Sequence, residues 1–86
     1  MIYRIEYTPS AARQVERLPR QIRSRVLDRI EGLAQTPRPV GAIKLAGHDA
    51  YRIRIGDYRV IYAIADERLV VLIVEVGHRR GVYRGW

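Results

Sequence analysis

The chain has 86 residues, 48% hydrophobic and 29% charged, a composition typical of one folded domain rather than a disordered segment. It contains no cysteine, which excludes a disulfide framework and a thiolate metal site. Sixteen basic residues against nine acidic ones give a net charge of +7, so the expected partner is a polyanion such as nucleic acid.

Two further classes of protein are excluded by the hydrophobic pattern. No stretch approaches the ~20 consecutive apolar residues that a membrane-spanning helix requires. The N-terminal segment Met1–Tyr7 lacks the apolar core of a signal peptide. We therefore expect a cytoplasmic protein with no membrane partner, folded as a single domain over residues 1–86.

The first part of the chain predicts a strand followed by two helices. Ile2–Tyr7 alternates apolar and polar residues with the period of a β-strand. Thr8 followed by Pro9 is typical of a helix start, and apolar residues at helical spacing continue to Leu18. A second apolar stripe predicts a helix over residues 20–35. We expect these helices to form an antiparallel hairpin packed on a sheet.

The second half of the chain predicts extended structure. Two prolines in Thr36–Pro39 prevent the second helix from continuing. Three strands are then predicted, over Tyr51–Ile55, Tyr58–Ala65 and Arg68–Gly77. The last of these strands is apolar on both faces, which favours a central position in the sheet.

The turn between the first two of these strands predicts a cluster of arginines. A two-residue turn at Gly56-Asp57, with positive φ at the glycine, places Arg54 directly opposite Arg59, and Arg52 lies on the same face. We call these three residues the arginine face. Like charges directly opposite one another destabilise a sheet, so this face predicts a bound anion such as RNA phosphate. The open alternative is the charged, solvated face of an edge strand.

A second two-residue turn, at Asp66-Glu67, would extend the arginine face onto the last strand. This register places Val74 opposite Arg59 and puts His78 on the arginine face. Arg79 would then lie at the rim. We therefore expect cations from three strands to converge on one surface.

The residues of this surface suit metal-free chemistry on RNA. The sequence has no paired carboxylates, no metal-ligand spacing, no serine beside a histidine and no glycine-rich phosphate loop, so no metal or small-molecule cofactor is expected. RNA supplies its own 2′-OH nucleophile, and cleavage needs cations, a proton acceptor and a proton donor. Arginines suit the first role but are poor bases. His78 is the candidate for proton transfer, with a structural role as the alternative. Tyr83 can stack on an exposed base.

Three blocks of sequence carry a family resemblance. They are KLAG at 44–47, YRIRIGDYRVIYAI at 51–64 and VGHRRGVYR at 76–84. In this order they resemble the RelE/ParE superfamily of toxin–antitoxin toxins, and RelE in particular. The resemblance implies an α+β fold with β-α-α-β-β-β order, in which a four-stranded antiparallel sheet carries a two-helix hairpin.

The resemblance also implies a function. RelE toxins of type II systems cut mRNA in the ribosomal A site without metal, through a 2′,3′-cyclic phosphate, and a cognate RelB-like antitoxin neutralises them. The site residues implied here are Arg52, Arg54, Arg59, Arg79 and Tyr83. In this assignment Arg79 protonates the leaving oxygen and Tyr83 stacks on the substrate base. RelE typically has lysines at positions 52 and 54, and a lysine loses a proton more readily than the arginines of this chain. His78 is therefore the expected general base here.

Two other functions remain open. ParE proteins share the fold and inhibit gyrase without cutting RNA, but generally lack the arginine–tyrosine set. A domain that binds RNA or protein without chemistry is also compatible with arginine at positions 52 and 54.

Overall fold

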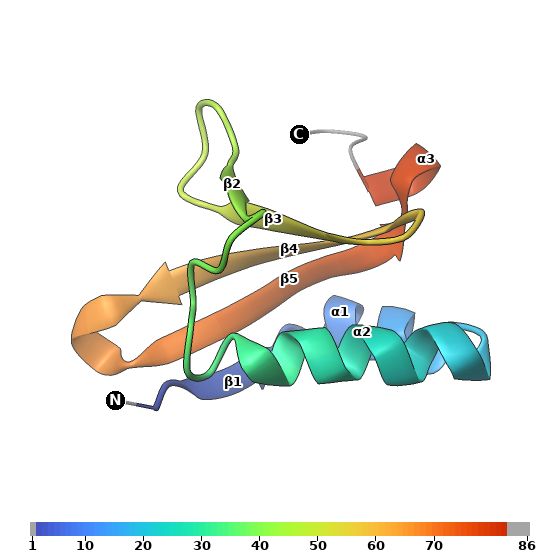
Figure 1. Ribbon diagram of the computed structural model, residues 1–86, viewed down its shortest axis with the longest axis horizontal. Helices are drawn as coiled ribbons and strands as arrows, with labels where there is room; N and C mark the ends of the chain where they lie inside the picture. Colours follow the sequence, from blue (N-terminus) through green and yellow to red (C-terminus); the bar gives the residue numbers. More distant parts are fainter. Residues whose placement is uncertain (1, 83–86) are drawn as a thin grey trace.

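The computed structural model describes residues 2–82. The elements in chain order are β1 (Arg4–Tyr7), α1 (Pro9–Glu16), α2 (Arg20–Gly32), β2 (Ile43–Lys44), β3 (Tyr51–Ile55), β4 (Tyr58–Ala65), a 3-10 helix (Asp66–Arg68), β5 (Val70–His78) and α3 (Arg79–Val82). The fold is α+β, with α1 and α2 together on one side of the sheet (Figure 1). None of the helices in residues 2–82 is long and apolar enough to span a membrane.

The sheet differs from the expected four-stranded antiparallel one. Over the described residues it has five strands in the order β1-β5-β4-β3-β2, and β1 pairs parallel to β5. The extra strand, β2, has only two residues, too few for a periodic pattern to reveal it. Alternation along β1 identifies its faces correctly, but the direction of a neighbouring strand leaves no mark in that pattern. The prediction that the last strand is central is confirmed, because β5 lies between β1 and β4.

The start of α1 shows how local chemistry sets an element boundary. Thr8 is the N-cap residue, with an extended backbone, and its Oγ1 accepts a hydrogen bond from the Ala11 N–H at 3.1 Å. Pro9 follows in the first turn, where its missing N–H is harmless. The predicted helix start is therefore confirmed.

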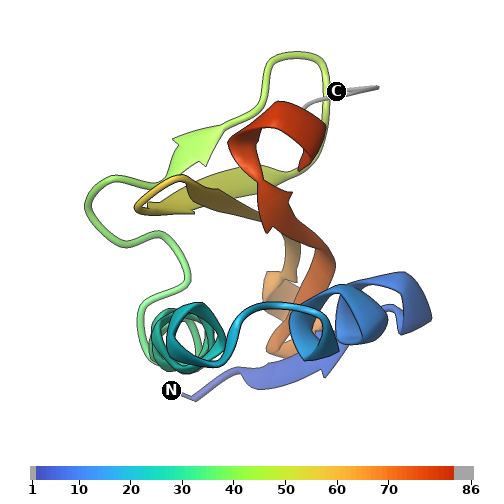
Figure 2. The ribbon, with the colours of Figure 1, turned by 90° about the vertical axis from the view of Figure 1, so that its right-hand side faces the viewer.

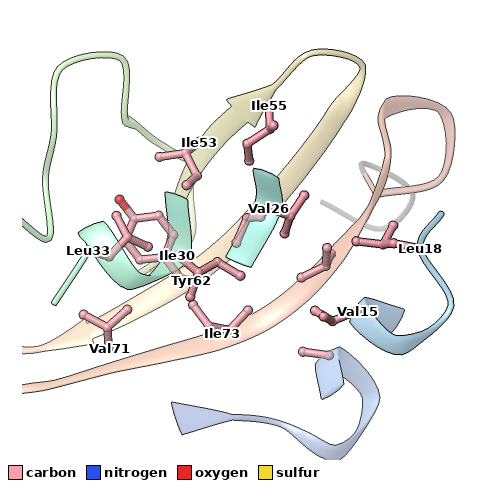
Figure 3. Packing of buried hydrophobic residues seen from close by; sticks show 13 residues of the cluster. Val15, Leu18, Val26, Ile30, Leu33, Ile53, Ile55, Tyr62, Val71 and Ile73 are labelled. Carbon is pink, nitrogen blue, oxygen red and sulfur yellow. The ribbon is translucent and has the colours of Figure 1, made fainter. Parts of the chain in front are cut away.

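The core lies between the helical layer and the face of the sheet that curls towards it (Figure 2). Its side chains come from both layers (Figure 3), and the largest fully buried ones include Ile30, Leu33, Ile53, Tyr62 and Ile73. The Tyr62 hydroxyl donates to the Pro37 carbonyl at 2.7 Å, so its polar atom is satisfied. Burial raises the pKa of Tyr62 to about 12.

A polar cluster joins segments that are distant in the sequence. Arg38, in the loop before β2, contacts Asp66 through both terminal nitrogens, at 2.8 and 3.3 Å. The Tyr3 hydroxyl donates to the same carboxylate at 2.6 Å, and Arg38 Nε donates to the Tyr51 hydroxyl at 3.1 Å. The hydrogen bonds from Arg38, and after them the one from Tyr3, hold the pKa of Asp66 below its usual range.

Candidate functional site

The arginine face forms as predicted from the β3–β4 hairpin. Arg54 pairs directly with Arg59, Arg52 pairs with Ile61, and Gly56 has a φ of +60° in the turn. The alternating residues of β3, including Ile53, are buried in the core against the helices. The arginine face therefore points away from α1 and α2.

Two segments stand on the same side of the sheet as the arginine face. Figure 1 shows α3 and the loop between β2 and β3 rising opposite the helical layer. In that loop, Leu45 and Ala50 pack on Ile61, in the cross-strand row that contains Arg52. At the other end, α3 contacts β4 and β5. The arginine face lies between these two segments.

The three arginines are not equally accessible. Arg54 is exposed and Arg52 is half-buried, whereas Arg59 is only 7% exposed. Arg59 Nη1 donates to two carbonyls of the turn, those of Gly56 and Tyr58, each at 3.2 Å. Arg59 thus helps to hold the hairpin, while the side chain of Arg54 is exposed to solvent.

The predicted register of the last strand is wrong. Arg59 lies opposite Gly77 rather than Val74, and His78 lies opposite Tyr58. Directly paired residues share a face, so His78 is on the face opposite to Arg59. There the rings of His78 and Tyr58 meet edge to face with centroids 5.5 Å apart.

Two local features produce this difference. The β4–β5 connection is a 3-10 helix followed by Leu69 in the left-handed region, so Ala65 pairs with Val70. This longer connection moves the register by two residues, which preserves the faces. A β-bulge between Ile61 and Tyr62 moves it by one more, which exchanges them.

His78 also has a hydrogen bond that suits a structural role. Its Nδ1 accepts from the Arg80 N–H at 3.3 Å, at the start of α3. In a neutral imidazole the other nitrogen, Nε2, then carries the proton. The geometry therefore favours the structural alternative for His78 over the predicted proton acceptor.

Arg79 lies where the strand leaves the sheet. Its backbone N–H donates to the Asp57 carbonyl at 2.8 Å, which fastens the start of α3 to the β3–β4 turn, and the residue is exposed. The helix α3 was not predicted from the sequence, since it has only four residues. Tyr83 lies outside the described residues. Within residues 2–82, no group of three or more histidines or acidic residues is placed to hold a metal.

Comparison with known proteins assigns the family. A family model described as "ParE toxin of type II toxin-antitoxin system, parDE" matches residues 5–83. Toxin RelG of Mycobacterium tuberculosis is 36% identical over 88 residues, covering 98% of this chain and 99% of that protein. The chain is a RelE-type toxin of the RelE/ParE superfamily. The mRNA interferase toxin RelE of Escherichia coli is 29% identical to the toxin over 82 residues, covering 92% of this chain and 85% of its own.

Solved structures agree with the toxin over almost its whole length. The archaeal RelE–RelB complex from Pyrococcus horikoshii contains a chain that matches it with a TM-score of 0.82 at 32% identity, covering 95% of this chain and all of that one. The RelBE2 toxin–antitoxin complex from M. tuberculosis contains a chain that matches with a TM-score of 0.78 at 28% identity, covering 92% of this chain and 100% of that one.

The approach of α2 to the hairpin turn of the toxin was not predicted from the sequence. Arg29 Nη1 donates to the Arg54 carbonyl at 3.3 Å, and Arg25 Nη2 lies 3.8 Å from where a Cβ on Gly56 would stand. The apolar stripe predicts the helix to which these arginines belong. It carried no signal that brings this part of α2 to a turn about 30 residues later.

Proposed function

We propose that the toxin is a ribosome-dependent endoribonuclease that cuts mRNA in the A site and so inhibits translation. The observation that carries the proposal is the arginine face, Arg52, Arg54 and Arg59, on the side of the sheet away from the helical layer. The E. coli relative is named an mRNA interferase, which supports the same activity for this chain.

The proposed reaction uses the RNA itself as nucleophile. The 2′-OH gives its proton to solvent water as its oxygen attacks the adjacent phosphorus, the bond from phosphorus to the 5′-oxygen breaks, and the products are a 2′,3′-cyclic phosphate and a 5′-hydroxyl. Arg52 and Arg54 would stabilise the negative charge that grows on the phosphate oxygens. Arg79, exposed beside the turn, is assigned to protonate the leaving 5′-oxygen, and Tyr83 to stack on the substrate base.

A cognate RelB-like antitoxin is the proposed protein partner. The solved relatives from P. horikoshii and M. tuberculosis are toxin–antitoxin complexes. This chain also exposes large apolar side chains, with Ile2 70% exposed and Ile43 49% exposed. Such side chains are suited to burial against a partner.

The function is tested with programmed ribosomes. The purified toxin should cut mRNA at the A-site codon and leave a 5′-hydroxyl on the downstream fragment. Arg79→Ala should slow cutting by roughly 10²-fold or more, as expected when one stabilising donor is removed, and Arg13→Ala on α1 is the matched control. Intact mRNA with accumulating gyrase-linked DNA breaks would instead establish a ParE-like activity. RNA binding without cutting would establish a non-catalytic domain.

A further inference from the structure

The arginines that α2 presents to the hairpin form a second cationic surface. Arg25, Asp28, Arg29 and Ile55 line a hollow of about 250 Å³ beside the β3–β4 turn. Arg29 anchors its guanidinium on the Arg54 carbonyl at 3.3 Å, so this hollow starts where the arginine face ends. The two surfaces meet at β3.

The edge of β3 between the two surfaces is open. Strand β2 pairs only with Tyr51 and Arg52, which leaves the rest of β3 without a neighbour on this side among the described strands. An extended chain can therefore cross from the arginine face to the hollow without meeting another strand. The charges favour an anionic chain, because Arg25, Arg29 and Arg54 form no ion pair within residues 2–82. Among residues 2–82, Asp28 is the single acidic residue that lines the hollow.

On the other flank of the arginine face, towards β1, the surface is mostly acidic. A hollow of about 370 Å³ over β1, β4 and β5 is lined by three acidic residues, Glu6, Asp49 and Glu67, and by one basic residue, Arg68. A polyanion on the arginine face is repelled from this side and attracted towards β3. This difference in charge favours a path for a bound polyanion that leads from the arginine face across β3, away from β1.

We propose that Arg25 and Arg29 form a binding subsite for RNA backbone phosphate, next to the arginine face across the edge of β3. The inference rests on the proposed function, because it takes the ligand of the arginine face to be RNA. Guanidinium forks match the oxygens of a phosphodiester, and the subsite continues the phosphate-binding surface that Arg54 begins. An acidic protein segment is the competing ligand.

The test measures binding without cleavage. A short single-stranded 2′-O-methyl RNA lacks the free 2′-OH nucleophile, so its affinity for the complete toxin can be measured over a range of salt concentrations. Arg25→Ala/Arg29→Ala should weaken binding by roughly tenfold or more. It should also reduce the slope of log K against log salt by about 1.4, because each phosphate of a single strand that is no longer neutralised changes the slope by ~0.7. The Arg25→Lys/Arg29→Lys variant keeps both positive charges but lacks the forked guanidinium. Its affinity for the RNA should lie between those of the unmodified toxin and the alanine variant.

The matched control is Arg13→Ala/Arg17→Ala, which removes two exposed arginines from α1 and its C-terminal end. This pair should leave the affinity within about twofold and the salt slope nearly unchanged. If both pairs weaken binding equally, the effect is net charge alone and the subsite is rejected. A loss confined to acidic peptides, with RNA binding unchanged, would assign the hollow to a protein ligand and also overturn the proposal.

Folding and function are separated by two further measurements. Thermal unfolding checks each variant, and Arg25→Ala alone replaces the pair if removing the Arg29 guanidinium from the Arg54 carbonyl unfolds the protein. The programmed-ribosome assay is run in parallel on the unmodified toxin. Failure to cut mRNA there rejects the proposed nuclease, whereas an unchanged salt slope in the α2 variant rejects only the subsite.

Discussion

The guanidinium of Arg59 is held against the β3–β4 turn, and this arrangement limits what the residue can offer a substrate. It is buried and donates to the Gly56 and Tyr58 carbonyls. Its neighbour across the hairpin, Arg54, is exposed and accepts a hydrogen bond through its backbone carbonyl. A substitution at each position should therefore affect stability and activity in different proportions.

We expect Arg54→Ala to reduce mRNA cutting by roughly 10²-fold while changing the free energy of unfolding by less than about 0.5 kcal/mol. Arg59→Ala should reduce cutting as well, but it should also destabilise the fold by about 1–3 kcal/mol, because two turn carbonyls lose their donor. Urea denaturation and the ribosome assay, run on the same preparations, measure both effects. Equal stability of the two variants would contradict this division.

The hydrogen bond of His78 gives a second prediction. His78→Ala should slow cutting, because α3 loses the side chain that accepts from the Arg80 N–H and Arg79 loses its fixed position. His78→Asn should restore most of the activity, since an amide oxygen can accept the same bond. The pH dependence of the cutting rate should keep its shape in the Asn variant. Disappearance of its acidic limb would make His78 the proton acceptor after all.

Tyr62 gives a prediction at alkaline pH. Its pKa rises from an ordinary value of 10.0 to about 12 in the folded protein, so the neutral hydroxyl is favoured there. The resulting stability is fully present below about pH 10 and is lost as the pH rises to about 12. Tyr62→Phe should lower the unfolding free energy at neutral pH by about 1 kcal/mol. This deficit should shrink above pH 10, as denaturation titrations would show.

At the scale of elements, the sequence predicts those features that depend on residues close together in the chain. The Thr8 cap, the Gly56-Asp57 turn and the limits of β4 all follow from local chemistry and are confirmed. The left-handed Leu69 had no such signal, because glycine usually occupies that conformation. The same limit explains why the arginine face was predicted and the position of His78 was not.

The bulge depends on interactions between residues that are distant in the sequence. Beside it, the Val74 carbonyl accepts from Thr8 Oγ1 at 3.2 Å, and the Val76 N–H donates to Gln14 Oε1 at 2.8 Å. Residues of the first helix and its cap thus bind backbone groups of β5 beyond Ile73, where the pairing with β1 ends. These partners lie more than 60 residues away, so no local pattern in β5 predicts the bulge.

Gln14→Leu tests this role of the first helix. The substitution removes the acceptor of the Val76 N–H in a part-buried position, and we expect a loss of about 1–3 kcal/mol of unfolding free energy. Gln21→Leu, at an exposed position of α2, is the control and should change stability by less than about 0.5 kcal/mol. Chemical denaturation measures both. Similar losses for the two variants would exclude a special role for Gln14.

At the scale of the whole molecule, the cluster around Arg38 and Asp66 connects the N-terminal segment, the loop before β2 and the β4–β5 connection. All of these interactions are near the surface, so they fasten segments together rather than supply a large share of the stability. Their contribution should therefore depend on pH and on salt.

Acid titration provides the test of this cluster. Because the pKa of Asp66 is lowered in the folded state, its stabilisation is present above the ordinary value of 3.8 and is lost as the pH falls through the lower folded value. Asp66→Asn should be less stable than the unmodified toxin at neutral pH. The unfolding free energies of the two proteins should converge in strong acid, and their difference should shrink in high salt. A constant difference across acid pH would refute the assignment.

The parallel pairing of β1 with β5 has a consequence for how the toxin is made. Arg4 pairs with Val70, so β1 cannot pair with β5 until the ribosome has synthesised the residues between them and β5 itself. Pairings between such distant residues form late and slowly, because a long loop must close before they contribute. A growing chain therefore carries Arg52 and Arg54 on β3 before β5 can join the sheet on the far side of β4. The sheet that carries the arginine face is therefore complete only after β5 has been synthesised.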